Sequence, residues 1–229
     1  MSAYRFPNRA MIEIVAPCAK LAEEPEMGLF AALEPLPALG ELDGDEPAAA
    51  VRVAWWEGGL YVAATVVKNG PIAVNRHEPL RNDCVAILIN TQPGPDQRRP
   101  TRSCWQFLAL PRGGGNDRMA PILRHEPFRY GPPQRKPDDA DMAIASTEKE
   151  DGYTLEMILR RSALGDAELS AGLEIGFEYV VHDSQWGQET WASPASVPVF
   201  DVPELWGRLE LSEGQADPPS KRKASRRKG

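Results

Sequence analysis

Residues 51–90, VRVAWWEGGLYVAATVVKNGPIAVNRHEPLRNDCVAILIN, contain the clearest structural pattern in the chain. Apolar and β-branched residues alternate at its start, and a Glu57-Gly58-Gly59 turn leads into a second such run over residues 60–68. Two runs joined by a short glycine turn predict a β-hairpin. After a polar loop at 70–81, residues 83–90 are apolar on both faces, which predicts a central strand covered on both sides.

Shorter runs of the same kind predict further strands along the chain. An Asp-Gly turn at 150–152 joins two of them into a second hairpin. The apolar run at 12–15 is expected to form an edge strand. The other expected strands cover residues 103–110, 119–125, 141–149, 152–161, 174–184 and 205–211.

Prolines dominate the segment that precedes the first hairpin. Five of them lie between residues 16 and 47, a density that excludes a long helix or a central strand. We therefore expect this segment to wrap around the sheet. The chain as a whole is predicted to be all-β: an antiparallel β-sandwich, jelly-roll-like and of immunoglobulin-like size, with a proline-rich N-terminal wrap.

Several motifs resemble one family of domains. The order W-x-x-x-G-L-Y-V at residues 55–62, a polar loop, and R-N-D-x-V-x-I-x-I-N-T at 81–91 resembles the carbohydrate-binding modules of family nine and the related DOMON-like β-sandwiches. The segments GYTLEMILRRSAL at 152–164 and LWGRLEL at 205–211 resemble later motifs of the same family. The resemblance implies a non-catalytic domain that binds carbohydrate.

On this basis the chain divides into three parts. Residues 1–40 are expected to form an N-terminal strand and wrapping segment, residues 41–212 a carbohydrate-binding-like β-sandwich, and residues 213–229 a disordered basic tail. The three cysteines are odd in number and far apart, which argues against a disulfide framework. With no signal-peptide pattern at the N-terminus and no membrane-spanning run, we expect a cytoplasmic protein and no membrane partner.

Charge is distributed unevenly along the chain. The net charge is −7, and the six basic residues between Lys221 and Lys228 contribute +6, so the remainder carries −13. An acidic body repels phosphate backbones, which leaves the tail as the only part expected to contact nucleic acid.

Tryptophans are the first candidates for ligand contacts. An indole ring stacks on the apolar face of a sugar, while polar groups at its rim bind the hydroxyls. Trp186 and Trp191 lie in a polar loop at 185–198 and are the leading candidates, followed by Trp56. The alternative for any tryptophan on an alternating strand, such as Trp55, is a place in the core.

Polar candidates lie where the 70–81 loop enters the next strand. Family nine domains draw polar ligand contacts near this point, so Arg81 and Asp83 are expected to orient the sugar. The alternative is that Asp83 caps a turn and Arg81 is solvated.

Other functions receive less support from the residues. The paired carboxylates of a glycoside hydrolase would have to come from Glu156 and Glu178, whose spacing does not place them together. No cofactor is expected. The resemblance allows a structural calcium ion at Asp43, Asp45 and Glu46, which lack the spacing of an EF-hand loop. A β-sandwich that serves structure or protein interaction, without a sugar site, is the remaining alternative.

Overall fold

The computed structural model describes residues 12–44, 46–194 and 196–215. Strands account for almost all of its regular structure, joined by turns and short 3-10 helices. The strands are β1 Val15–Lys20, β2 Ala49–Trp56, β3 Gly59–Val67, β4 Cys84–Asn90, β5 Cys104–Gly114, β6 Ala120–His125, β7 Met142–Lys149, β8 Gly152–Arg160, β9 Glu174–Asp183, β10 Gly187–Thr190 and β11 Gly207–Gln215. The 3-10 helices are η2 Leu29–Ala32, η3 Leu39–Asp43, η4 Pro79–Arg81, η5 Asp139–Asp141, η6 Arg161–Leu164 and η7 Pro203–Leu205.

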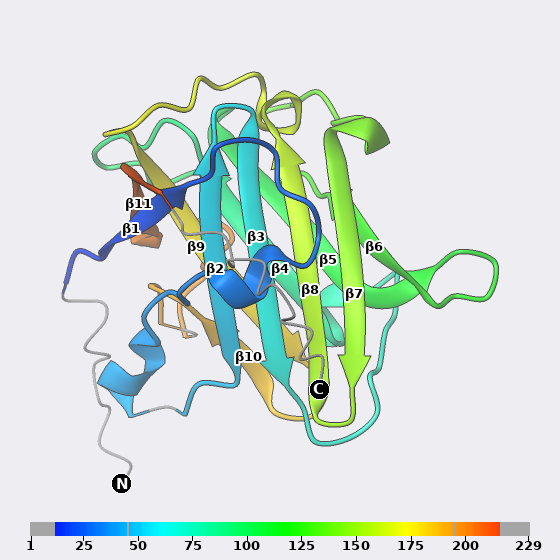
Figure 1. Ribbon diagram of the computed structural model, residues 1–229. Coiled ribbons are helices and arrows are strands. Elements are labelled where there is room, and N and C mark those ends of the chain that lie inside the picture. Colours follow the sequence, from blue (N-terminus) through cyan, green and yellow to red (C-terminus); the bar gives the residue numbers. More distant parts are fainter. Residues whose placement is uncertain (1–11, 45, 195, 216–229) are drawn as a thin grey trace, which may run out of the picture.

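The strands form one strongly curved sheet that folds back on itself as a two-layered sandwich. Its order is β6-β5-β4-β9-β11-β1-β2-β3-β8-β7, with β10 paired to β9. In Figure 1, β2, β3, β8 and β7 form the front layer, and β4, β5, β9 and β6 lie behind them. Strands β11 and β1 connect the layers on one side, and β6 comes near β7 on the other, so the sheet is nearly closed. The predicted all-β sandwich is confirmed.

The main core lies between the two layers. Alternate residues of each strand point into it, as the period of two in an extended chain requires. Strand β4 is buried along its whole length, because its other face is covered as well. The predicted central strand at 83–90 is therefore confirmed. The tryptophans of this core come from β2 (Trp55), β5 (Trp105) and the loop after β10 (Trp191).

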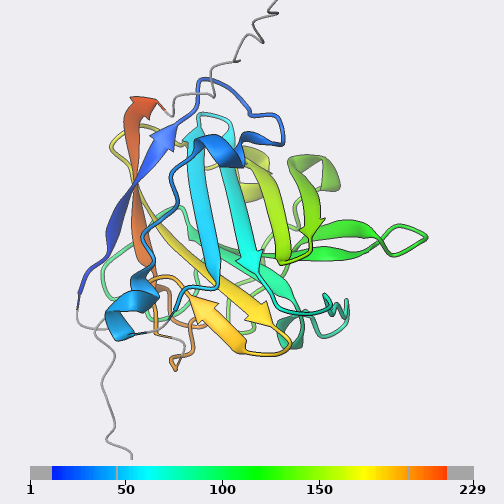
Figure 2. The ribbon, with the colours of Figure 1, turned by 60° about the horizontal axis from the view of Figure 1, so that its bottom comes forward.

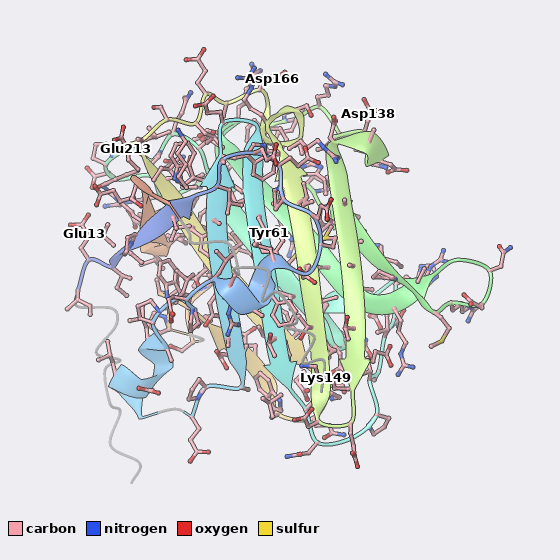
Figure 3. All side chains as sticks on the ribbon, viewed as in Figure 1. Glu13, Tyr61, Asp138, Lys149, Asp166 and Glu213 are labelled. Carbon is pink, nitrogen blue, oxygen red and sulfur yellow. The ribbon has the colours of Figure 1, made fainter. Side chains whose placement is uncertain are left out.

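The segment after β1 covers the outer face of the front layer. Leu21 and Leu33, with Met27 and neighbouring apolar residues, pack on Trp56 and on residues of β3 and β8. Figure 1 shows this segment crossing in front of those strands. Figure 3 shows Tyr61 on the layer that it covers. A second small core protects the outer face of β4, β5 and β9 and includes Phe128, Val199 and Trp206.

Three boundaries differ from the sequence-based expectation. The expected edge strand at 12–15 is instead β1, which starts at Val15 and runs parallel between β11 and β2, so the sheet is not purely antiparallel. Small buried side chains, Ala16 and Cys18, allow this inner position. The β5 strand continues through Pro111 to Gly114, and the 185–198 loop contains β10. All three cysteines of the chain are buried and free.

Candidate functional site

Three connections meet at one end of the sandwich. They are the long loop between β3 and β4, the turn between β9 and β10, and the β5–β6 hairpin. Figure 2 brings this end forward and shows the β5–β6 hairpin reaching away from the body. In Figure 3 the label on Lys149 marks the β7–β8 turn at the same end. Loops at one end of a sandwich are common positions for binding residues, since a rigid scaffold holds them.

A buried ion network ties the bases of two of these loops together. Lys68, directly after β3, places its Nζ 2.8 Å from Asp183 Oδ2 and 3.2 Å from Asp83 Oδ1. All three side chains are about 99% buried or more. Burial alone lowers the pKa of Lys68, but its hydrogen bonds to Asp183 and Asp83 outweigh this effect and raise the pKa, so the ammonium stays charged.

The same carboxylates hold the backbone of the loops. Asp83 accepts hydrogen bonds from the N–H groups of Ala73 (2.7 Å) and Ser184 (2.8 Å). Asp183 Oδ1 accepts from the N–H groups of Gln185 (2.7 Å) and Trp186 (3.2 Å). A buried charge with several hydrogen bonds fixes local geometry strongly. The network therefore determines where the β9–β10 turn presents its side chains.

Trp186 lies on this turn with its side chain open to solvent. It is 42% exposed, whereas the other five tryptophans of the chain are at most 6% exposed. The neighbouring Gln185 packs against Gly70, where a Cβ atom would come within 2.7 Å of the Gln185 amide nitrogen. Trp186 is thus an exposed aromatic ring on a rigid turn, next to the β3–β4 loop.

An open groove runs between the β3–β4 loop and the β5–β6 hairpin. Its volume is about 560 Å³, within the range of about 300–1,000 Å³ that small-molecule sites usually have. The lining combines two apolar side chains with amide, imidazole and guanidinium groups. It consists of Ile72, Val74, Asn75, Arg76, His77, Arg112, Gly113 and Arg118.

The other predicted site residues lie in different environments. Trp191 is fully buried, with its indole N–H 3.2 Å from the carbonyl oxygen of Pro37, and Trp56 is buried under the N-terminal segment. Neither presents a ring face to solvent. Arg81 is exposed and pairs with Glu78 at 3.3 Å. Asp83 belongs to the buried ion network, where it holds loop backbone and has no free surface for a ligand.

The two carboxylates considered for hydrolysis do not form a pair. Glu156 lies on the outer face of the front layer and accepts hydrogen bonds from the Tyr61 hydroxyl and from the N–H of Gly28. Glu178 lies in the other layer, on the face turned away from the main core, and accepts from the N–H groups of residues 191–193. With the whole core between them, they cannot flank one glycosidic bond.

Neither a metal nor a membrane site emerges among the described residues. No three histidine, cysteine or acidic side chains in that part of the chain gather closely enough to hold an ion. Asp45 of the calcium hypothesis lies outside the described residues. In the same ranges, no helix has the length and apolar character needed to cross a bilayer. The basic tail at 221–228 also lies outside the described residues.

His182 gives this region a pH-dependent stability. Its ring stacks on Phe200 at 6.2 Å, its Nε2 is buried without a hydrogen-bond partner, and burial lowers its pKa to about 4. Because the unfolded chain binds the proton more tightly, stability is lost as pH falls from about 6.5 towards 4. We expect the stability of the wild type relative to His182→Phe to fall by up to about 3 kcal/mol as the pH is lowered across this range. Urea unfolding of both proteins at several pH values tests this; parallel pH profiles would contradict it.

Sequence reasoning missed the partners that build this end. Lys68 was assigned only to a strand, and Asp183 only to the end of another. Each of the two is a charged residue at the end of an otherwise apolar run, which is the only local sign of a buried ion pair. The pairing itself could not be predicted, because Lys68 and Asp183 are 115 residues apart. The sequence analysis does not identify Arg112 and Arg118, because both lie between the expected strands at 103–110 and 119–125. No local pattern indicated that the segment between these strands faces the β3–β4 loop.

Comparison with solved structures identifies the class of fold. The chain is similar to a carbohydrate binding module of family 9 from Caldicellulosiruptor kristjanssonii in complex with glucose, with a TM-score of 0.59 and 16% identity over 90% of this chain and 98% of that one. A complex of such a module from the same organism with cellotriose gives a TM-score of 0.58 and 16% identity, covering 90% and 96%. A proposed carbohydrate-binding protein from Bacteroides uniformis gives 0.56 and 13%, covering 87% and 99%.

These likenesses establish the fold. The chain has the β-sandwich fold of the family 9 carbohydrate-binding modules, which confirms the resemblance inferred from its motifs at the level of the fold. The likeness to DOMON domains stays a prediction. Neither models of known protein families nor curated protein sequences match this chain.

Proposed function

We propose that the protein is a non-catalytic carbohydrate-binding module whose sugar ring stacks on Trp186. The observation that carries the proposal is the exposed Trp186 ring, held on a turn that the buried Lys68, Asp83 and Asp183 network fixes. A sugar presents an apolar C–H face that an indole covers well, and a rigid ring loses little entropy on binding. The family 9 modules with the same fold are seen with glucose and cellotriose, which supports this class of ligand.

Polar groups on the loops at this end of the sandwich are suited to the hydroxyls of a sugar. Gln185 lies beside Trp186 with a side-chain amide, and Asn75 in the neighbouring groove supplies another. Arg81 is exposed on the same β3–β4 loop and supplies a guanidinium for orientation. In this proposal Asp83 does not touch the sugar but holds the loop backbone by its hydrogen bonds. Trp191 and Trp56 do not touch the sugar either, and their buried rings stabilise the fold.

The test is isothermal titration of the full chain with glucose, cellotriose and a wider panel of neutral oligosaccharides. We expect saturable binding that weakens about tenfold or more in Trp186→Ala, since stacking contributes on the order of 1.5 kcal/mol. Trp186→Phe serves as the matched variant and should keep most of the affinity, because it retains a flat ring.

Thermal unfolding provides the control for this test. Trp186→Ala should unfold within about 0.5 kcal/mol of the wild type, because an exposed side chain is removed. Unchanged affinity in Trp186→Ala would reject the stacking role. No binding to any saccharide by the folded wild type would reject carbohydrate binding altogether and favour an interaction domain.

A further inference from the structure

The groove between the β3–β4 loop and the β5–β6 hairpin has a charge opposite to that of the protein as a whole. Three arginines line it, Arg76, Arg112 and Arg118, although the chain carries a net charge of −7. We propose that the saccharide bound at this end is acidic, with a uronate carboxylate held in the groove by Arg76 and Arg118. This inference rests on the proposed function and names the chemical class of its ligand.

Arg112 and Arg124 hold the walls of the groove in place and are not assigned to the ligand. Arg112 donates a hydrogen bond to the carbonyl oxygen of Ile72 and has its Nε 3.8 Å from Glu148 Oε1, so its charge is partly balanced. Arg124 donates to the carbonyl oxygen of Arg76 at 2.9 Å and pairs with Glu126 at 3.1 Å. These bonds link strands β5 and β6 to the β3–β4 loop and hold the opening between them.

Arg76 and Arg118 remain available to a ligand. Both are exposed, and no carboxylate of residues 12–44, 46–194 or 196–215 lies within ion-pair distance of either. By contrast, the exposed Arg81 and Arg135 each pair with an acidic residue three positions away. Two guanidinium groups that share one groove without a counter-charge repel each other, and an anion between them removes that repulsion.

The backbone at Arg118 supports this placement. Its φ of 60° lies in the left-handed region, which few residues other than glycine adopt, and its carbonyl oxygen accepts a hydrogen bond from the Gly113 N–H at 2.9 Å. The β5–β6 hairpin therefore closes tightly and returns Arg118 to the groove that Arg112 also lines.

The remaining lining suits a sugar acid better than a simple ion. The planar guanidinium forks a carboxylate with two parallel hydrogen bonds. Ile72 and Val74 provide apolar surface for the C–H face of a ring, and Asn75 provides both a donor and an acceptor for hydroxyls. A small inorganic anion would leave most of this open groove of about 560 Å³ unused.

The experiment compares sugars that differ only at one carbon. The full chain is titrated with methyl β-glucoside and methyl β-glucuronide, and with the corresponding galactoside and galacturonide, at low and high salt. We expect the uronide of at least one pair to bind about tenfold or more tightly than its neutral partner, with a preference that falls as salt rises. Sodium sulfate is the anion-only probe and should compete weakly.

Paired variants locate the preference. The Arg76→Gln, Arg118→Gln double variant replaces each charged guanidinium by a neutral polar amide. It should lose the uronide preference while binding neutral glycosides as the wild type does. Arg135→Gln, which removes an exposed arginine that is not among the groove-lining residues, should change neither.

Each other outcome has a distinct meaning. Equal binding of neutral and acidic sugars overturns this inference and leaves the proposed function intact. A preference for the uronide that survives in the double variant has the same meaning, because Arg76 and Arg118 then do not hold the carboxylate. If sulfate competes as strongly as the uronide, the groove binds anions in general, and the inference that its ligand is an acidic saccharide is overturned. Failure of every sugar to bind overturns both proposals.

Discussion

Replacing Lys68 by methionine is expected to lower the free energy of unfolding by about 3–5 kcal/mol. The substitution removes the only cation within ion-pair distance of Asp83 and Asp183 among the described residues and leaves both carboxylates buried. An uncompensated buried charge costs more than the lost attraction alone, because water cannot reach it. Urea unfolding followed by tryptophan fluorescence measures the change.

Two matched variants separate the buried network from ordinary ion pairs. Arg135→Met breaks an exposed pair with Asp138 and should cost less than about 1 kcal/mol. The triple variant Lys68→Met, Asp83→Asn, Asp183→Asn removes all three charges but keeps amide oxygens for the loop N–H groups, so it should recover part of the loss. A Lys68→Met protein as stable as Arg135→Met would show that the network contributes little.

The network also predicts a local effect. Because Asp83 and Asp183 accept hydrogen bonds from Ala73, Ser184, Gln185 and Trp186, the loss of Lys68 should loosen the β9–β10 turn before the rest of the sandwich. Amide exchange at these positions is the direct measure. In this way the stability of the protein and the orientation of Trp186 depend on the same buried charges.

Local turn chemistry explains why the hairpins were predictable from sequence. The β7–β8 turn ends at Gly152, whose φ is 145° and where a Cβ atom would lie 1.9 Å from the Val66 carbonyl oxygen. Only glycine fits there, and the Asp-Gly pair that marks such turns is visible in the sequence. The β2–β3 hairpin has the same kind of signal at residues 57–59.

Long-range pairing explains what was not predictable. Strand β1 lies between β2 and β11, and its partner Arg208 is far from Val15 in sequence. The hydrophobic periodicity of a short segment does not indicate which distant strand it pairs with. The candidate site depends on the same kind of contact, since Lys68 joins residues from two other strand ends. Trp186 was predicted as a candidate because it lies in a polar loop, and the same reasoning placed Trp191 beside it.

Trp191 differs from Trp186 because a buried carboxylate draws its segment inward. Both Glu178 side-chain oxygens accept backbone hydrogen bonds from this stretch: Oε1 from Trp191 N (2.6 Å), and Oε2 from Ser193 N (2.7 Å). Burial raises the pKa of Glu178 to about 7, while those N–H groups oppose the shift. The indole then packs edge-on to Phe177 at 5.7 Å and lies so close to Gly207 that a Cβ atom would come within 2.7 Å of it.

Trp191→Ala is therefore expected to cost about 3–5 kcal/mol, the usual cost of emptying a core site of this size, and to lower the melting temperature by roughly 10 °C. Trp186→Ala should leave the melting temperature within about 2 °C of the wild type and act on sugar affinity alone. Trp191→Phe, which retains a ring in the core, should remain folded and bind sugar as the wild type does. If Trp191→Phe folds normally but loses sugar affinity as Trp186→Ala does, the buried indole contributes to the site and Trp186 is not its sole stacking surface.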